Sequence, residues 1–178
     1  MIDVHVIELA KRNDDAAFDT IFNTYNQKVY KTAWLILRDH QLAEDIVQDV
    51  FLKVYSQICK LSNSMAFEKW LYKITVNLCF KAIKKRKKVD VVQLDEYTEK
   101  LCADRNVSIA NPDLLIVHKE IIKRVMKAIY SLPIKNRTAL ILFYFNELNI
   151  KEISSIVNSS EGTVKSRLFY GKKIIKNL

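Results

Sequence analysis

Glycine and proline are almost absent from this chain, with two of each among 178 residues. Tight β-hairpins depend on glycine and similar turn residues at positive φ, so the sequence argues against a many-stranded sheet. Apolar residues make up 49% of the chain, which is enough for real cores. The length suits one domain or two small ones. We therefore predict an all-α protein whose helices are joined by short polar breaks.

Apolar residues recur at three- and four-residue steps in three segments of the N-terminal half. This spacing predicts three packed amphipathic helices. The first covers about Asp15 to Leu37, the second carries the apolar positions from Ala43 to Val54, and the third begins near Phe67. A polar loop, Lys60–Met65, precedes the third helix. We predict a first domain at residues 1–88.

Residues 89–113 differ from the predicted helices, because their apolar residues show little helical periodicity and they contain six acidic residues against two basic ones. We predict a flexible acidic linker there, which could reach about 80 Å if fully stretched at ~3.3 Å per residue. The helical pattern returns at Leu114 and stops at Leu132-Pro133, because proline lacks a backbone donor. We predict a further helix at Arg137–Phe145. The predicted fold is two small helical domains, 1–88 and 114–178, on this linker.

The net charge of +9 favours a polyanionic partner such as nucleic acid. Three cysteines without CxxC spacing predict reduced thiols in a cytosolic protein. The N-terminus does not resemble a signal peptide, and no apolar stretch approaches the ~20 residues of a membrane span. We expect a cytoplasmic protein.

Glu152–Leu168 has the pattern of a helix-turn-helix: a short amphipathic helix, a polar break at Asn158–Ser160, then a basic helix. Ser160 or Ser159 can cap this last helix. In such motifs the second helix lies in the DNA major groove. Four residues of the last helix are predicted to point outward: Lys165, Ser166, Phe169 and Tyr170. A basic solvated face is the alternative, and the two aromatic residues favour groove contact.

The second helix has an acidic face opposite its apolar one, formed by Asp45, Gln48, Asp49 and Leu52. It is either an ordinary solvated surface or a docking patch with Leu52 as its apolar anchor. A carboxylate metal site is disfavoured, because no histidine lies at a useful helical spacing. We predict no metal, no cofactor and no enzymatic activity.

The third helix has a basic outer side that includes Lys73, Phe80 and Lys84, with Asn77 beside it. Lysines can follow phosphates while an aromatic ring stacks on a base of single-stranded nucleic acid. Packing of Phe80 against a neighbouring helix explains the same pattern equally well. Both interpretations stay open.

Two groups of residues resemble the bacterial sigma-70 family of RNA polymerase sigma factors, in its extracytoplasmic-function (ECF) group. The first is AEDIVQDVF at Ala43–Phe51, followed by Phe67, Trp70-Leu71, Ile74 and Asn77. The second is Leu132-Pro133, Arg137, Glu152-Ile153 and GTVKSRL at Gly162–Leu168. They match the patterns of the family's regions 2 and 4, in that order. Ser154, where many members have alanine, is a departure.

The resemblance implies a transcription initiation factor that binds the β′ and β subunits of the RNA polymerase core, single-stranded promoter DNA at −10 and duplex DNA at −35. It assigns Asp45, Gln48, Asp49 and Leu52 to polymerase. It assigns Ser62, Asn63, Ser64, Lys73, Asn77, Phe80 and Lys84 to the −10 element. It assigns Thr163, Lys165, Ser166, Arg167, Phe169, Tyr170 and Lys173 to the −35 element. It also implies an anti-sigma factor, often membrane-bound, and no small-molecule substrate.

Two rival functions are also compatible with the sequence. A homodimeric helix-turn-helix regulator would bind operators without polymerase and would leave the acidic face without a role. A helical adaptor would use that face without contacting DNA.

Overall fold

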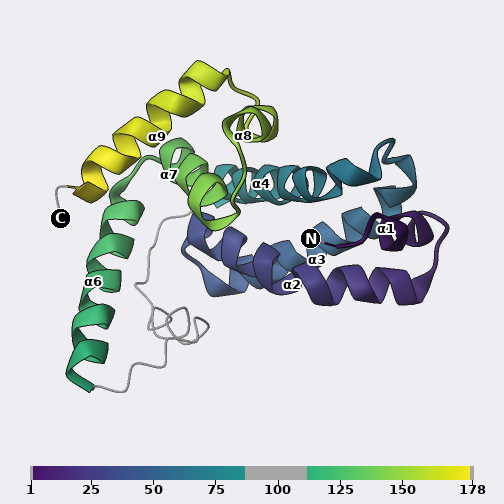
Figure 1. The fold of residues 1–178 in the computed structure, drawn as a ribbon, viewed down its shortest axis with the longest axis horizontal. Helices are drawn as coiled ribbons and strands as arrows, with labels where there is room; N and C mark the ends of the chain where they lie inside the picture. Colours follow the sequence, from purple (N-terminus) through teal and green to yellow (C-terminus); the bar gives the residue numbers. More distant parts are fainter. Residues whose placement is uncertain (1, 87–111, 177–178) are drawn as a thin grey trace.

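The computed structural model describes residues 2–86 and 112–176, and every regular element in them is helical (Figure 1). The N-terminal half contains α1 (Val4–Ala10), α2 (Asp15–Leu37), α3 (His40–Gln57), the short turns η1 (Ile58–Lys60) and η2 (Ser64–Ala66), and α4 (Phe67–Arg86). The C-terminal half contains α6 (Pro112–Ser131), α7 (Ile134–Leu140), the π-helical η3 (Ile141–Phe145), α8 (Ile150–Ile156) and α9 (Glu161–Lys176). The prediction of an all-α fold in two helical parts is confirmed. Most of the predicted linker lies outside the described residues.

Polar side chains cap the first turns of α2 and α3. The carboxylate of Asp14 accepts a hydrogen bond from the Ala17 amide at 2.8 Å at the start of α2. Asp39 does the same for Leu42 at 2.9 Å at the start of α3. Each cap satisfies one of the backbone donors that a helix N-terminus leaves unpaired.

The ends of α2 and α8 use left-handed residues other than glycine. Arg38 closes α2 with φ 60°, and Asn158 follows α8 with φ 47°. Glycine normally takes this conformation because it has no Cβ, and both glycines here lie within α9 instead. Because the chain has so few glycines, other residues take the positive φ at these two helix ends, at a cost in conformational free energy.

The N-terminal half is a bundle in which α2 packs on α1, α3 and α4. α2 spans Asp15 to Leu37, as predicted from its periodicity. Its centre is fully buried at Ile21, Tyr25 and Val29. Burial of each large apolar side chain contributes about 1.5–3 kcal/mol relative to exposure. The helix α1 was not predicted, and it buries Ile7 against the bundle.

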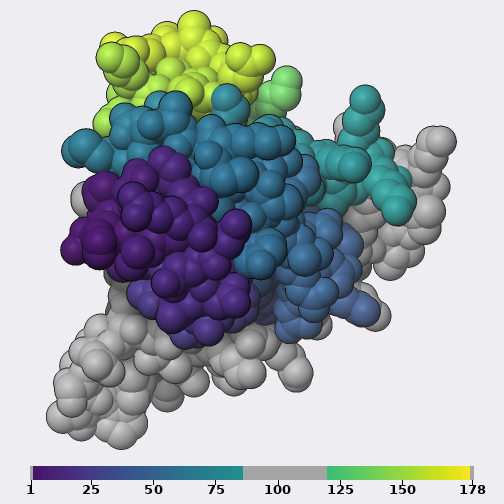
Figure 2. Space-filling model, turned by 90° about the vertical axis from the view of Figure 1, so that its right-hand side faces the viewer, coloured from purple at the N-terminus to yellow at the C-terminus, as the bar shows by residue number. Residues whose placement is uncertain are grey.

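The two halves of the chain pack against each other and share one continuous apolar core. α8 packs on α4, and both η3 and α7 pack on α2. In the space-filling view the last helices lie directly on those of the N-terminal half (Figure 2). The sequence predicted two domains, but it did not predict how they are placed relative to each other.

The buried surface of α4 is wider than the apolar stripe that its sequence predicts. Phe67 and Leu71 of that stripe are buried, and so are Tyr72, Val76 and Cys79. These three recur at helical spacing and form a second buried row, on a helix that packs on both the N-terminal bundle and α8. Burial raises the pKa of the Tyr72 phenol and of the Cys79 thiol to about 12 each.

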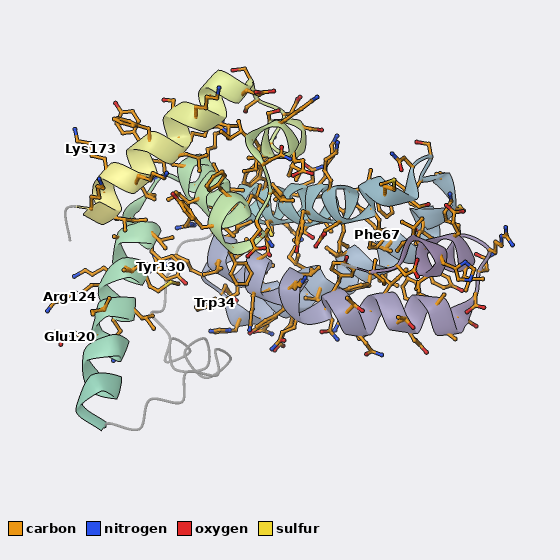
Figure 3. The ribbon with its side chains drawn as sticks, in the orientation of Figure 1. Trp34, Phe67, Glu120, Arg124, Tyr130 and Lys173 are labelled. Atoms are coloured by element: carbon orange, nitrogen blue, oxygen red, sulfur yellow. The ribbon has the colours of Figure 1, made fainter. Side chains whose placement is uncertain are left out.

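Specific contacts also join the halves. The ring of Tyr130 meets the ring of Trp34 edge-on, with centroids 6.2 Å apart (Figure 3). The guanidinium of Arg38 lies 4.4 Å from the centroid of the Tyr130 ring, which is a cation–π contact. The amide of Asn146 donates a hydrogen bond to the Thr32 hydroxyl at 2.9 Å. Aromatic packing and polar pairing therefore both contribute to the way the halves are docked.

Candidate nucleic-acid interface

The acidic face of α3 is solvent-exposed, as its spacing predicts. The buried side of the helix contains Ile46, Val50 and Val54. All four residues of the acidic face are exposed: Asp45, Gln48, Asp49 and Leu52. Leu52 is 69% exposed, which is high for a leucine. An exposed apolar side chain beside two carboxylates is suited to docking a protein that presents cations around an apolar pocket.

Aromatic residues that were not predicted as part of this face lie beside it. Tyr55, three residues after Leu52, is exposed, and its ring meets that of Phe18 at 5.0 Å between centroids. Phe22 of α2 is also exposed and contacts Phe51 at 4.8 Å. Tyr55 could have been found from sequence, because residues three apart share a helix face. Phe22 comes from another helix, so only the packing of α2 on α3 reveals it.

The polar loop predicted at Lys60–Met65 is a compact connection made of η1 and η2. The side chain of Asn63 accepts a hydrogen bond from the Met65 amide at 2.9 Å, which caps η2. Ser62 and Asn63 are exposed, and Met65, which was not predicted as a contact, is 82% exposed. Ser64 is placed differently from its neighbours, because it is buried and bonded to α1.

The outer side of α4 carries three exposed polar residues at helical spacing: Lys73, Asn77 and Lys84. Phe80, in the same row, is half-buried and packs against the core. Its ring therefore has a packing role, and the part that remains exposed lies between Asn77 and Lys84. Together they form a cationic row with one aromatic edge, which suits an unpaired strand.

The helix-turn-helix is formed by α8 and α9. α8 begins with a capping box, in which Asn149 accepts from the Glu152 amide at 3.0 Å and Glu152 accepts from the Asn149 amide at 2.9 Å. Of the two candidate caps for α9, Ser160 accepts from the Thr163 amide at 3.2 Å. The reciprocal box at Asn149 was not predicted, although an asparagine three residues before a glutamate is its usual sequence signal.

The outer face of α9 is cationic and aromatic. Val164 and Leu168 are buried and hold the helix on the domain. Six of the residues predicted to contact DNA are exposed: Thr163, Lys165, Ser166, Phe169, Tyr170 and Lys173. Phe169 is 68% exposed, and its ring meets that of Tyr170 edge-on. Arg167 is half-buried, and the hydroxyl of Thr163 lies 2.9 Å from that of Ser160. The face can offer both hydrogen-bond donors and apolar edges to a DNA groove.

Within residues 2–86 and 112–176 no helix is both long and apolar enough to cross a bilayer. The same part of the chain contains no cluster of histidine, cysteine and carboxylate side chains that could hold a metal ion.

Comparison with protein families identifies both halves. The family model "Sigma-70 region 2" matches residues 21–89, and "Sigma-70, region 4" matches residues 122–175. The first contains the acidic face and the loop, and the second contains the helix-turn-helix. α1 lies before the first match.

Relatives match over nearly the whole length. The chain is 31% identical to the ECF RNA polymerase sigma factor SigW of Bacillus subtilis, covering 96% of this chain and 92% of SigW. It is 33% identical to SigM of the same organism, covering 90% of this chain and 93% of SigM. The fold resembles that of the sigma factor RpoE of Bartonella quintana, solved with the anti-sigma factor NepR, with a TM-score of 0.70, 19% identity and coverage of 90% and 94%. This chain belongs to the ECF group of sigma-70 family sigma factors, which are non-enzymatic factors for transcription initiation by RNA polymerase.

Proposed function

We propose that three separate surfaces of this sigma factor divide the work of initiation. The acidic face of α3 binds core polymerase, the loop and α4 hold the unpaired −10 strand, and α9 reads the −35 duplex. The observation that supports this division is that the acidic face and the cationic face lie exposed on different helices of different halves. The packing between the halves buries neither of these two faces.

The chemistry of α9 suits a major groove. Lys165 can donate to guanine acceptors, Ser166 can bond several base edges, and the rings of Phe169 and Tyr170 can touch thymine methyl groups. Arg167 and Lys173 would contact the phosphate backbone, which adds affinity without selecting sequence.

The chemistry of the loop suits a base that has left the stack. Ser62 and Asn63 present short polar side chains, which can bond the edge of a flipped base. Lys73 and Lys84 would follow the phosphates of the same strand. Contacts made only to the flipped base offset the few kcal/mol that unstacking costs, and so favour strand opening.

The geometry of a promoter requires the two halves to separate. Elements about 17 base pairs apart at ~3.4 Å per pair lie some 60 Å apart. In the packed structure α8 lies against α4. We infer that the packed arrangement belongs to the factor before it joins a promoter, and that polymerase holds the halves apart during initiation.

The anti-sigma partner and the location are also proposals. The similar RpoE structure is a complex with an anti-sigma factor, NepR. An anti-sigma factor that stabilised the packed arrangement would keep this chain from promoters. The protein would act in the cytoplasm, where polymerase and the chromosome are.

The test separates the two main surfaces. Asp49→Lys should lower the affinity for core polymerase, whereas Lys165→Ala should leave that affinity unchanged and reduce start-site-specific transcription. Glu147→Lys, at an exposed position outside both faces, is the charge-matched control and should change neither. If Asp49→Lys and Lys165→Ala both altered only DNA binding, the division of labour would be wrong.

The homodimeric regulator is the poorer alternative. It requires only the helix-turn-helix, whereas the chain also matches sigma region 2 over residues 21–89. Tight binding of the purified chain to a palindrome without polymerase would favour it.

A further inference from the structure

The N-terminal helix α1 lies outside the region 2 match, yet it is tied to the polar loop between α3 and α4. It sits at the end of the bundle that is remote from α6 and α9 (Figure 1). One side of it is anchored, because Ile7 is 1% exposed and Ala10 is buried too. A helix held in this way can act as a rigid support for whatever its other side contacts.

That other side holds Ser64 in a three-residue network. The Ser64 hydroxyl donates a hydrogen bond to the Glu8 carboxylate. The ammonium of Lys11 donates to the Ser64 oxygen at 3.4 Å and pairs with Glu8 at 3.2 Å. Each member thus contacts the other two. The hydrogen bond from Ser64 and that from Lys11 lower the pKa of Glu8, because both bonds favour the ionised carboxylate.

Ser64 is the anchored residue in a loop whose other members face solvent. Ser64 is 7% exposed, whereas Ser62, Asn63 and Met65 are all exposed. The Asn63 side chain bonds the Met65 amide, so its orientation depends on the backbone that Ser64 fixes. A hydrogen bond to a charged group is stronger than a neutral one, so this anchor is stronger than a hydroxyl–hydroxyl contact would be.

We propose that Glu8 and Lys11 are positioning residues for −10 recognition, which hold the loop through Ser64 in the shape that receives a flipped base. This inference rests on the proposed function of the loop. Pocket specificity requires contact groups to be held within a fraction of an ångström, and bonds to a rigid neighbouring element provide this. The base itself would be contacted by Ser62 and Asn63, not by α1.

The experiment uses the full chain bound to core polymerase and a promoter set with each of the four bases at every −10 position. Strand opening is measured by permanganate reactivity of unpaired thymines. We expect Glu8→Ala and Ser64→Ala each to reduce discrimination between the preferred and other bases roughly tenfold, which corresponds to about 1.4 kcal/mol. The double variant should be no worse than either single one, because both remove the same bond.

Two comparisons distinguish positioning from a general loss of structure. Lys11→Met should reduce discrimination, whereas Arg12→Met, an exposed cation one residue further along, should not. The exchange Glu8→Lys with Lys11→Glu should restore much of the discrimination, because the pair and a bond to Ser64 can form again. Polymerase affinity and the melting temperature are measured alongside, and both should stay close to those of the parent.

The outcomes separate this inference from the function it rests on. If Asn63→Ala changes base preference and none of the α1 variants does, the positioning role is wrong and the loop function stands. If Asn63→Ala and Ser62→Ala also leave preference unchanged, the loop captures no base and both proposals fail. A fall in polymerase affinity that accounts for the whole loss in Glu8→Ala and Lys11→Met would likewise overturn the positioning role.

Discussion

The guanidinium of Arg137, in region 4, donates a hydrogen bond from Nη2 to the carbonyl oxygen of Ile36, in region 2, at 2.6 Å. Ile36 lies in the last turn of α2, where backbone carbonyls have no partner within the helix. Arg137 is buried, and this desolvation, with the nearby charge of Arg38, lowers its pKa to about 10. A cation removed from water thus satisfies a helix end in the other half of the chain.

Arg137→Ala should loosen the docking of the two halves. The substitution leaves the Ile36 carbonyl buried without its partner, at a cost of about 1–3 kcal/mol, less the desolvation that the lost cation no longer suffers. We expect a larger radius of gyration in X-ray scattering and a lower melting temperature.

The control for this prediction is Arg124→Ala. Arg124 pairs with Glu120 at 2.8 Å on the outside of α6, with both side chains more than 60% exposed (Figure 3). Exposed pairs contribute about 0–1 kcal/mol, so this variant should keep both the scattering and the melting temperature of the parent. Equal behaviour of the two variants would show that the Arg137 contact does not hold the halves together.

Leu52→Ala should weaken binding to core polymerase without weakening the fold. An anchor at the centre of an interface contributes about 1–2 kcal/mol or more, so we expect a rise in Kd of about tenfold. Met65→Ala removes another highly exposed apolar side chain from outside the acidic face and should leave polymerase affinity unchanged. Titration of labelled protein with core polymerase measures both. An unchanged Kd for Leu52→Ala would show that the acidic face does not bind polymerase.

The two glycines should respond in opposite ways to alanine. A Cβ at Gly171 would lie 2.7 Å from Cγ of Leu140, so α9 could no longer approach α7 as it does. Overpacking of this kind costs about 1–3 kcal/mol. At Gly162 the nearest atom would be 3.9 Å away, and alanine should be neutral or stabilising by up to about 1 kcal/mol. Denaturant unfolding of the two variants checks the pair, and equal stabilities would contradict it.

Alkaline conditions should destabilise the fold through buried phenols. Burial raises the pKa of Tyr25 and of Tyr72 to about 12. The native state then holds protons that the unfolded state loses near pH 10, so stability is full below that pH and falls as pH rises towards 12. Ultraviolet titration should show these tyrosines ionising late and together with the loss of helical circular dichroism. Ionisation of all tyrosines near pH 10 with the helices intact would contradict this.

Several elements could be predicted because their cause is local. α2 follows from its repeating apolar positions, and the Ser160 cap follows from a serine placed before a helical run. The exposed face at Asp45, Asp49 and Leu52 follows from helical geometry alone, because its opposite side is uniformly apolar. In each case residues within a few turns of each other contain the whole physical reason.

Other elements depend on contacts between residues far apart in the chain. α1 is seven residues long, too short for periodicity to show, and it is stabilised by packing on α2. Ser64 was expected to face DNA with its neighbours, but it turns towards Glu8, 56 residues away. The second buried row of α4 includes Tyr72, which could not be inferred from one helix because its burial depends on the elements packed around α4.

The amino-acid pattern was sufficient for the helices other than α1, their polar faces and the family, because periodicity, capping and short motifs depend on neighbouring residues. The docking of the two halves and the support of the loop by α1 were decided only by the tertiary structure. Both include hydrogen bonds across long separations, such as the 101 residues between Ile36 and Arg137, and the docking also rests on apolar and aromatic packing between the halves. Such bonds leave no periodic trace, since each partner is one polar group whose direction is set by the packing of everything around it.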